Sequence, residues 1–291
     1  MRPAYVVTVE TPRRFLLDGL WFGPKKAKRV IVFVHGLTSS AFAMSHLIDE
    51  LVDRNTAVLS FNNRGFKIVT DIKQLDKTGN TVKWRNTGGA HEVFTDCMDD
   101  IQGAVDFARK AGARDIFLMG HSTGAQKSVY WMAKRGRGVR AAILLGALSD
   151  YACALELRSK RDLAKAVARA RSFVKKGKPH QLLPQSLTAP YTLDAQRFVS
   201  LYSPDSAEEI FTYAEKKKPR VLRRVRKPLL VFLAGNEEHT KRPAVEIARW
   251  FALNTAPGSR TVVVPDVRHN FKGAERQISR TIKEFIKEAV Q

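Results

Sequence analysis

The feature that most constrains the fold is an alternation of short, nearly all-apolar runs with longer segments of helical periodicity. Residues 29–34 read Arg-Val-Ile-Val-Phe-Val, and 115–119 and 141–145 are similarly rich in apolar side chains. Runs of this length and uniformity are typical of strands that are covered on both faces, as in a parallel sheet. Because helical segments separate them, we predict a doubly wound, mostly parallel α/β sheet with right-handed connections.

Three stretches depart from this alternation. Residues 4–22 alternate loosely and are expected to form a β-hairpin, whereas 66–90 form a long, polar connection of the kind that is often functional. Residues 149–227 are polar, helix-rich and interrupted by prolines, and we interpret them as an insertion over the strand ends. The expected organisation is a core of residues 1–148 and 228–291 with a helical cap insertion at 149–227.

Length and cysteine content narrow the class of protein further. The chain has 291 residues, which suffices for one α/β domain with a buried core and an insertion. Its two cysteines, Cys97 and Cys153, exclude a disulfide scaffold and leave a single bridge open, with reduced thiols as the default. The N-terminal residues lack the apolar core of a signal peptide, and no apolar run approaches the ~20 residues of a membrane span. We therefore expect a cytoplasmic protein without a membrane span.

The motif with the clearest chemistry is Gly-His-Ser-Thr-Gly at residues 120–124, a G-x-S-x-G pattern. An apolar strand precedes it and a helix follows it, which is the setting that a nucleophile elbow requires. Glycine at both ends permits the close backbone approach of so sharp a turn. We therefore predict that Ser122 projects beyond the end of its strand as a nucleophile; the alternative is a glycine-flanked turn with an inert serine.

A serine hydroxyl is a poor nucleophile at neutral pH and needs a general base. Among the seven histidines, His269 has the most suitable place, in the loop between the last predicted strand and the final helix. His239, His180 and His91 have no comparable placement. His121 lies inside the elbow and is better interpreted as a packed neighbour of the nucleophile. We predict His269 as the base, the alternative being an exposed loop histidine.

The base in turn needs a carboxylate that fixes its tautomer and stabilises its protonated form. The apolar run that ends at residue 234 continues as Gly-Asn-Glu-Glu, and a G-x-x-acid pattern after the penultimate strand selects Glu238. Glu237 lies one residue away, and Asp150 and Asp266 follow other strand ends. We predict Glu238 as the triad acid and keep these three carboxylates as alternatives.

Negative charge that develops on a substrate carbonyl oxygen must be met by preorganised donors. The pair His35-Gly36 ends the first central strand, and the glycine permits a tight turn that directs the following backbone N–H into the site. Thr123 stands at the start of the helix after the elbow, where backbone N–H groups lack intrahelical partners. We predict the N–H groups of Leu37 and Thr123 as the oxyanion hole.

Taken together, these motifs resemble those of the α/β-hydrolase superfamily over nearly the whole chain. The matching features are the serine, acid and histidine in that order along the chain, and the turns that carry them. The resemblance implies the α/β-hydrolase fold, a helical cap that excludes water and shapes an acyl or alcohol pocket, and no metal or cofactor. A glutamate stands where the superfamily usually has an aspartate.

A narrower resemblance is to a group that includes fungal siderophore esterases. Its members share a G-H-S-T-G elbow followed by glutamine, here Gly120 to Gln126, and an upstream helix that contains Asp-Cys, here Asp96-Cys97. This resemblance does not transfer a substrate.

The charge of the chain is unusual, with 50 Lys and Arg against 28 Asp and Glu, a formal net charge of +22. Residues 151–227 hold 18 of these basic residues and 7 of the acidic ones, so half of the excess falls in the predicted cap. A basic, solvated surface is the favoured interpretation, and steering of an anionic ester and association with nucleic acid or an anionic membrane are the alternatives. Because the basic runs hold no interleaved aromatic residues, no nucleic-acid partner is expected.

The sequence thus predicts a serine hydrolase that cleaves small carboxylic esters, anionic ones included, through an acyl-enzyme. In this hypothesis Ser122 attacks, His269 carries the proton, Glu238 orients His269, and the amides of Leu37 and Thr123 hold the oxyanion. The same machinery serves acyltransferases, thioesterases and peptidases, because a fold does not fix a reaction. A basic binding protein on a hydrolase scaffold is the alternative class, and the oligomeric state is not predicted.

Overall fold

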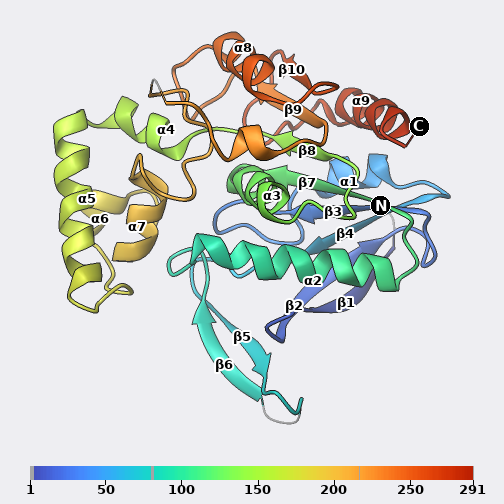
Figure 1. Cartoon of the computed structure of the whole chain (residues 1–291), viewed down its shortest axis with the longest axis horizontal. Helices are drawn as coiled ribbons and strands as arrows, with labels where there is room; N and C mark the ends of the chain where they lie inside the picture. Colours follow the sequence, from blue (N-terminus) through green and yellow to red (C-terminus); the bar gives the residue numbers. More distant parts are fainter. Residues whose placement is uncertain (1–2, 80–81, 216, 291) are drawn as a thin grey trace.

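The computed structural model describes residues 3–79, 82–215 and 217–290 (Figure 1). Within these ranges the strands are β1 (Ala4–Glu10), β2 (Phe15–Phe22), β3 (Arg29–Val34), β4 (Thr56–Phe61), β5 (Thr70–Leu75), β6 (Val82–Thr87), β7 (Asp115–His121), β8 (Ala142–Leu145), β9 (Leu229–Ala234) and β10 (Arg260–Val264). They form one sheet in the order β10-β9-β8-β7-β3-β4-β2-β5-β6, with β1 paired to β2. The run from β10 to β4 is parallel, and the strands beyond β4 pair antiparallel. The predicted doubly wound, mostly parallel sheet and the opening hairpin are confirmed.

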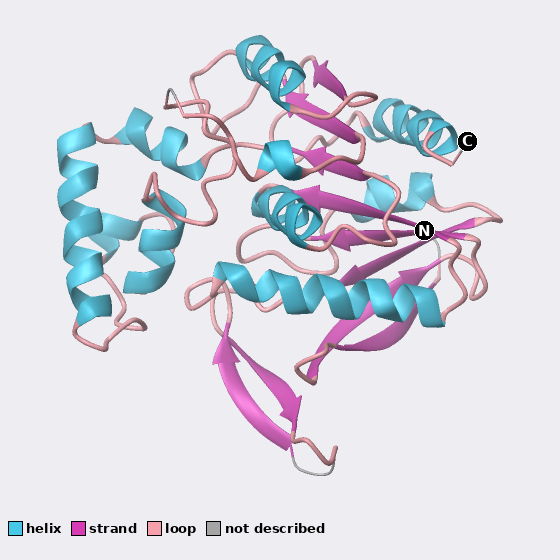
Figure 2. Ribbon diagram, viewed as in Figure 1, coloured by secondary structure: helices cyan, strands magenta, loops and turns pink. Residues whose placement is uncertain are grey.

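Helices cover both faces of this sheet (Figure 2). They are α1 (Ser45–Leu51), α2 (Cys97–Lys110), α3 (Thr123–Lys134), α8 (Ala244–Asn254) and α9 (Glu275–Glu288), with a 3-10 turn η1 (Phe94–Asp96) before α2. The packing of the central strand β3 explains why nearly all its residues are apolar. Val30 and Val32 pack in the same cluster as residues of α2, α3 and α8, whereas Ile31 and Phe33 pack with residues of α1 and α9. Both faces of the strand are therefore core.

The segment between β8 and β9 is helical and lies to one side of the sheet (Figure 1). It contains α4 (Asp150–Leu157), α5 (Lys160–Lys175), α6 (Gln185–Thr188), α7 (Ala195–Tyr202) and a 3-10 turn η2 (Leu222–Arg224). The arrowheads of β7 and β8 point toward these helices, so the segment stands beyond the carboxyl ends of the strands. It has an apolar cluster of its own, in which Val167 and Ala170 of α5 pack with Phe198 and Leu201 of α7.

The polar connection at 66–90 is more regular than its sequence suggests. β5 and β6 pair as an antiparallel hairpin that continues the sheet beyond β2 and projects from its end (Figure 1). The side chains of β6 are nearly all exposed, so neither face carries the apolar alternation by which a strand is recognised in sequence. β5 pairs with Phe15 and Leu16 of β2, and this pairing extends the sheet although the composition of 66–90 does not indicate strands.

Two further findings concern the cysteines and the helices of the described part of the chain. Cys97 and Cys153 are both free, Cys97 buried and Cys153 half-buried, so no bridge joins them. None of the helices in residues 3–79, 82–215 and 217–290 combines the length and apolarity needed to cross a membrane.

Candidate active site

The sharp turn between β7 and α3 places Ser122 outside regular structure. Its φ is 55° and its ψ −127°, a combination that L-residues rarely adopt and that surrounding structure must enforce. The two glycines of the motif make the turn possible. A Cβ at Gly120 would lie 2.2 Å from the carbonyl oxygen of Gly124, and one at Gly124 would lie 2.0 Å from that of Val34. The predicted elbow geometry at Ser122 is therefore what the chain adopts.

The loop after β3 packs directly against this serine. A Cβ at Gly36 would lie 2.9 Å from the Cβ of Ser122, so only glycine lets the two turns approach. His35 fixes the loop from within, because its Nδ1 donates to the Gly36 carbonyl at 2.8 Å and its Nε2 accepts the Asn63 N–H at 3.1 Å. Burial lowers the pKa of His35 to about 3, with the nearby Lys127 ammonium acting in the same direction, so the ring is neutral and keeps this tautomer.

The two predicted oxyanion donors come from these two turns. Thr123 is the first residue of α3, and its N–H is not consumed by the helix. Leu37 and Thr38 are the central residues of a turn closed by the Ser39 N–H and the Gly36 carbonyl at 3.3 Å, with Thr38 at φ 55°. The Leu37 side chain packs against the apolar cluster of the insertion. The elbow and the β3 loop thus bring both backbone segments next to Ser122.

His269 follows β10 and is nearly buried, with 8% of its surface exposed. Gly146, after β8, packs against the ring, and a Cβ there would lie 2.7 Å from His269 Cε1. The rings of His239 and His121 also contact it, with centroids 4.6 and 5.0 Å from that of His269. Among the described residues, His269 Nε2 is buried without a hydrogen-bond partner. That nitrogen is available to a group in the cavity that Ser122 and His269 share.

The carboxylate that meets the His269 ring is Glu237, and the expectation for Glu238 is corrected here. Glu237 Oε2 lies 2.8 Å from His269 Nδ1, whereas Glu238 Oε2 accepts the backbone N–H of His269 at 2.8 Å. The reason is the path of the turn after β9. Gly235 and Asn236 donate their N–H groups to the carbonyls of Val264 and Val267, which holds the turn against the end of β10. Held in this way, the chain turns the side chain of residue 237 toward the ring.

The other two acid candidates lie elsewhere. Asp266 is exposed and adopts φ 56° in the loop after β10. Asp150 does line the cavity, but its Oδ2 accepts the amide of Gln126 at 2.7 Å. Burial, followed by repulsion from Glu208, raises the pKa of Asp150 to about 7. The Asp150 carboxyl group therefore lines the cavity in a partly protonated form near neutral pH.

His121, interpreted from the sequence as a packed neighbour of the nucleophile, lies beside the ring of His269 with centroids 5.0 Å apart. Its Nε2 donates to the backbone carbonyl of His269 at 3.0 Å. Burial, with the nearby His269 ring acting in the same direction, lowers the pKa of His121 to about 4, so the ring stays a neutral donor. The hydrogen bond ties the turn that carries the serine to the loop that carries the histidine.

The cavity at this site has a volume of about 980 Å³ including its opening to solvent. The core contributes the serine, the histidine and Gly146, and the insertion contributes most of the remaining wall, including Leu163, Leu187, Tyr191 and Tyr202. Sequence reasoning did not single out the polar lining residues His239, Arg158 and Cys153. No local motif marks them: the fold of the insertion brings Arg158 and Cys153 to the cavity, and His239 reaches it from the loop after β9. Burial raises the pKa of the Cys153 thiol, which disfavours a thiolate there.

A buried ionic network joins α3, the helix after Ser122, to the insertion. This network was not predicted from the sequence. Lys127 of α3 pairs with Glu92, and Arg197 of α7 bonds Glu92 at 3.0 Å and Glu208 through two nitrogens. Burial alone would raise the pKa of Glu92, but the Lys127 and Arg197 charges lower it, so Glu92 is an anion. The network fixes the insertion relative to the helix that begins at the nucleophile.

Two groups of three residues in the described part of the chain bring metal-ligating atoms within 4.8 Å of one another. One consists of Glu237, His239 and His269 and coincides with the site just described. An ion there would replace the contact between His269 Nδ1 and Glu237 Oε2 that orients the ring toward the cavity. The second group lies apart from the cavity lining.

The sheet order, the strained serine between strand and helix, and the histidine after the last strand define an α/β-hydrolase fold. Solved structures with this fold match nearly the whole chain. Esterase Pf2001 from Pyrococcus furiosus is 17% identical with a TM-score of 0.63, covering 100% of this chain and 92% of its own. The siderophore hydrolase EstB from Aspergillus fumigatus is 14% identical with a TM-score of 0.67, covering 99% and 98%. A carboxyl esterase from Bacillus coagulans is 13% identical with a TM-score of 0.68, covering 100% of both chains.

The predicted α/β-hydrolase fold is thus confirmed, and a siderophore hydrolase is among the structures that share it. Residues 21–290 match the family described as "Protein of unknown function (DUF1749)", and the chain belongs to that family. No curated protein matches its sequence.

Proposed function

We propose that this protein is a serine hydrolase that cleaves carboxylic esters through an acyl-enzyme intermediate. The observation that carries the proposal is the environment of His269. Glu237 holds its Nδ1 at 2.8 Å, its Nε2 is buried and unpartnered among the described residues, and its ring lines one cavity with Ser122. An imidazole oriented on one nitrogen and free on the other is what a serine nucleophile requires. The esterases among the matching folds support the same class of reaction.

In the proposed mechanism, Ser122 Oγ attacks the ester carbonyl carbon while His269 Nε2 takes the hydroxyl proton. Glu237 stabilises the imidazolium, and the N–H groups of Leu37 and Thr123 bind the oxygen that becomes negative. The carbonyl re-forms as the bond to the alcohol breaks, and Nε2 returns the proton to the departing alcohol. Water then attacks the acyl-enzyme with His269 as base, which releases the carboxylic acid and regenerates the serine.

The insertion acts in this proposal as a cap with its boundaries at residues 149 and 227. Its tyrosines and leucines supply apolar wall opposite the serine, while Phe198 and Leu201 pack inside the insertion itself. A cavity with apolar walls and a small number of polar groups is typical of a site for small molecules. The proposed substrate is therefore a small ester with an apolar portion seated under the cap.

A fluorophosphonate probe tests the nucleophile, because it phosphonylates activated serines. Wild-type protein should be labelled, and Ser122→Ala should not be; equal labelling of both would contradict the assignment. A panel of p-nitrophenyl esters of increasing acyl length tests the reaction. Labelling of Ser122 without turnover of any ester would reject ester hydrolysis, and product transfer to an added alcohol or amine in preference to water would indicate an acyltransferase.

A further inference from the structure

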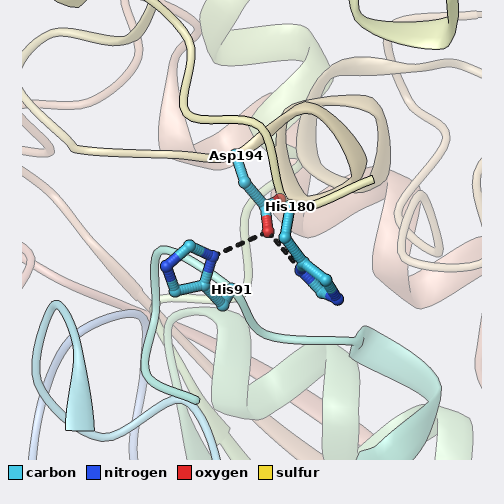
Figure 3. A group of neighbouring side chains, drawn as sticks. All are labelled: His91, His180 and Asp194. Atoms are coloured by element: carbon cyan, nitrogen blue, oxygen red, sulfur yellow. Dashed lines mark hydrogen bonds and ion pairs between the residues drawn. The ribbon is translucent and has the colours of Figure 1, made fainter. Parts of the chain in front are cut away.

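A second cluster of chemically capable side chains lies outside the active-site cavity. His91 comes from the loop after β6, His180 from the loop after α5, and Asp194 from the residue before α7. The Nδ1 atoms of the two histidines lie 2.9 and 2.7 Å from the same atom, Asp194 Oδ2. Figure 3 shows both rings directed at that oxygen from different sides. One residue of the core and two of the insertion thus meet at a single point.

The carboxylate at the centre of this cluster is held rigidly. Asp194 is fully buried, and its Oδ1 accepts the backbone N–H of Arg197 at 2.7 Å as the N-cap of α7. Its own N–H donates to the carbonyl of Ala90 at 2.9 Å, next to His91 in the chain. With Oδ1 and the backbone both engaged, Oδ2 is the oxygen left to the two imidazoles. A ligand carboxylate oriented by such partners is the usual support of a metal site.

We propose that His91, His180 and Asp194 form a binding site for a divalent transition-metal ion of the Zn²⁺ type. Two imidazole nitrogens and one carboxylate oxygen are a donor set that such ions prefer, and the three ligand atoms lie within 4.8 Å of one another. Metal–ligand bonds of about 2.0–2.2 Å in a tetrahedron separate the ligand atoms by about 3.3 Å. The two N–O pairs therefore need to open by only about half an ångström.

The two rings bring both Nδ1 atoms to Asp194 Oδ2 from different directions, which is the convergence that a shared cation requires. Their planes meet at 78° with centroids 5.7 Å apart, so the rings do not stack. Two neutral imidazoles that donate to one oxygen bring two positive N–H dipoles together, whereas a cation between the three atoms makes each of them a ligand. The side chain of His180 is 57% exposed, which leaves solvent access for a fourth ligand such as water.

An ion at this point would fasten the insertion to the core. His91 belongs to the core segment, and the other two ligands flank the loop that leads from α5 to α7. The cluster shares no residue with the cavity lining, so the site does not depend on the proposed ester hydrolysis. The bound ion would instead strengthen the attachment of the insertion to the core.

The test uses the full chain, stripped with a chelator and titrated with Co²⁺ and with Zn²⁺. Binding is followed by the visible absorption of Co²⁺ and by equilibrium dialysis. The affinity should fall at least tenfold in His91→Gln and in His180→Gln. It should be unchanged in His46→Gln, a histidine outside both clusters, and in His239→Gln, which removes the competing group at the active site.

Absence of stoichiometric binding, or wild-type affinity in both cluster variants, would overturn the proposal, as would loss of binding in His239→Gln alone. The second readout concerns the fastening. Zn²⁺ should raise the melting temperature of the wild type and protect residues 176–194 from limited proteolysis, and it should do neither in His180→Gln. Because His180 is exposed, this variant is expected to fold, and circular dichroism checks that it does. An ion that binds without either effect would reject the fastening role.

Discussion

The proposed triad depends at the scale of single residues on which of two adjacent glutamates faces the histidine ring. Glu237→Gln should lower kcat for a p-nitrophenyl ester by 100-fold or more, because the amide cannot stabilise the imidazolium and favours the wrong tautomer. Glu238→Gln should keep kcat within about tenfold, because an amide oxygen still accepts the His269 N–H. Steady-state kinetics on the two variants, with melting curves to confirm folding, make the comparison. The reverse order of effects would restore Glu238 as the triad acid.

Asp150 gives a prediction about pH and stability. Burial raises its pKa to about 7 from the ordinary value of 3.8, so between these values the native state holds a proton that the unfolded state has lost. The Asp150 contribution to stability therefore falls as pH rises through this window and is fully lost above pH 7. Relative to wild type, Asp150→Asn should gain roughly 2–5 kcal/mol of unfolding free energy between pH 4 and pH 8.

Urea unfolding at several pH values measures this difference. Asp266→Asn is the matched control, because Asp266 is exposed and asparagine tolerates its φ of 56°. A difference for Asp150→Asn that stays flat with pH, or one that Asp266→Asn reproduces, would show that Asp150 is ionised in the native state.

The residues of the site differ in how far sequence alone could place them, for a physical reason. The elbow at Ser122 is fixed by local sterics, since its two glycines are needed wherever so sharp a turn occurs. His269 was placed by its position after a strand. Glu237 was kept only as an alternative to Glu238, because hydrogen bonds from Gly235 and Asn236 to Val264 and Val267 hold the turn that directs its side chain to the ring. Such contacts between segments far apart in the chain cannot be predicted from a local sequence motif.

Arg197 couples elements of the fold, because it joins α7 to the core through Glu92 and also pairs with Glu208 inside the insertion. Removal of this guanidinium leaves two buried carboxylates without it, so Arg197→Met should lower the free energy of unfolding by about 3–5 kcal/mol. Arg171→Met is the matched control in the same insertion. Arg171 pairs with Asp205 at the surface, and its loss should cost less than about 1 kcal/mol. Denaturant titrations that give equal losses for the two variants would contradict this account.

Elements with a strong apolar period were predictable, and polar ones were not. β3, β7 and β8 were found because burial on both faces makes them continuously apolar. The β5–β6 hairpin was taken for a connection, since its side chains are largely exposed and its pairing is a property of the sheet edge. The helices of the insertion were expected as a group. Their cluster around Phe198 and their ionic link to α3 arise from contacts between segments far apart in sequence.

The charge of the whole molecule bears on the proposed function through the insertion. The formal net charge is +22, and residues 151–227 carry 18 Lys and Arg against 7 Asp and Glu. This segment supplies much of the wall of the active-site cavity, so its field acts where a substrate enters. Clefts with walls of one sign of charge concentrate ligands of the opposite sign, and salt screens the effect. Among the Lys and Arg residues of this segment, Arg158 lines the cavity itself.

An anionic ester should therefore be cleaved with a salt dependence that its neutral counterpart lacks. Raising NaCl from about 10 mM to about 300 mM should lower kcat/KM for mono-p-nitrophenyl succinate by about 3–10-fold and leave p-nitrophenyl butyrate nearly unchanged. Arg158→Gln should weaken the preference for the succinate ester while keeping most of the salt dependence, since steering arises from the whole insertion. Equal salt dependence for both esters would mean that the basic residues form a solvated surface with no part in substrate selection.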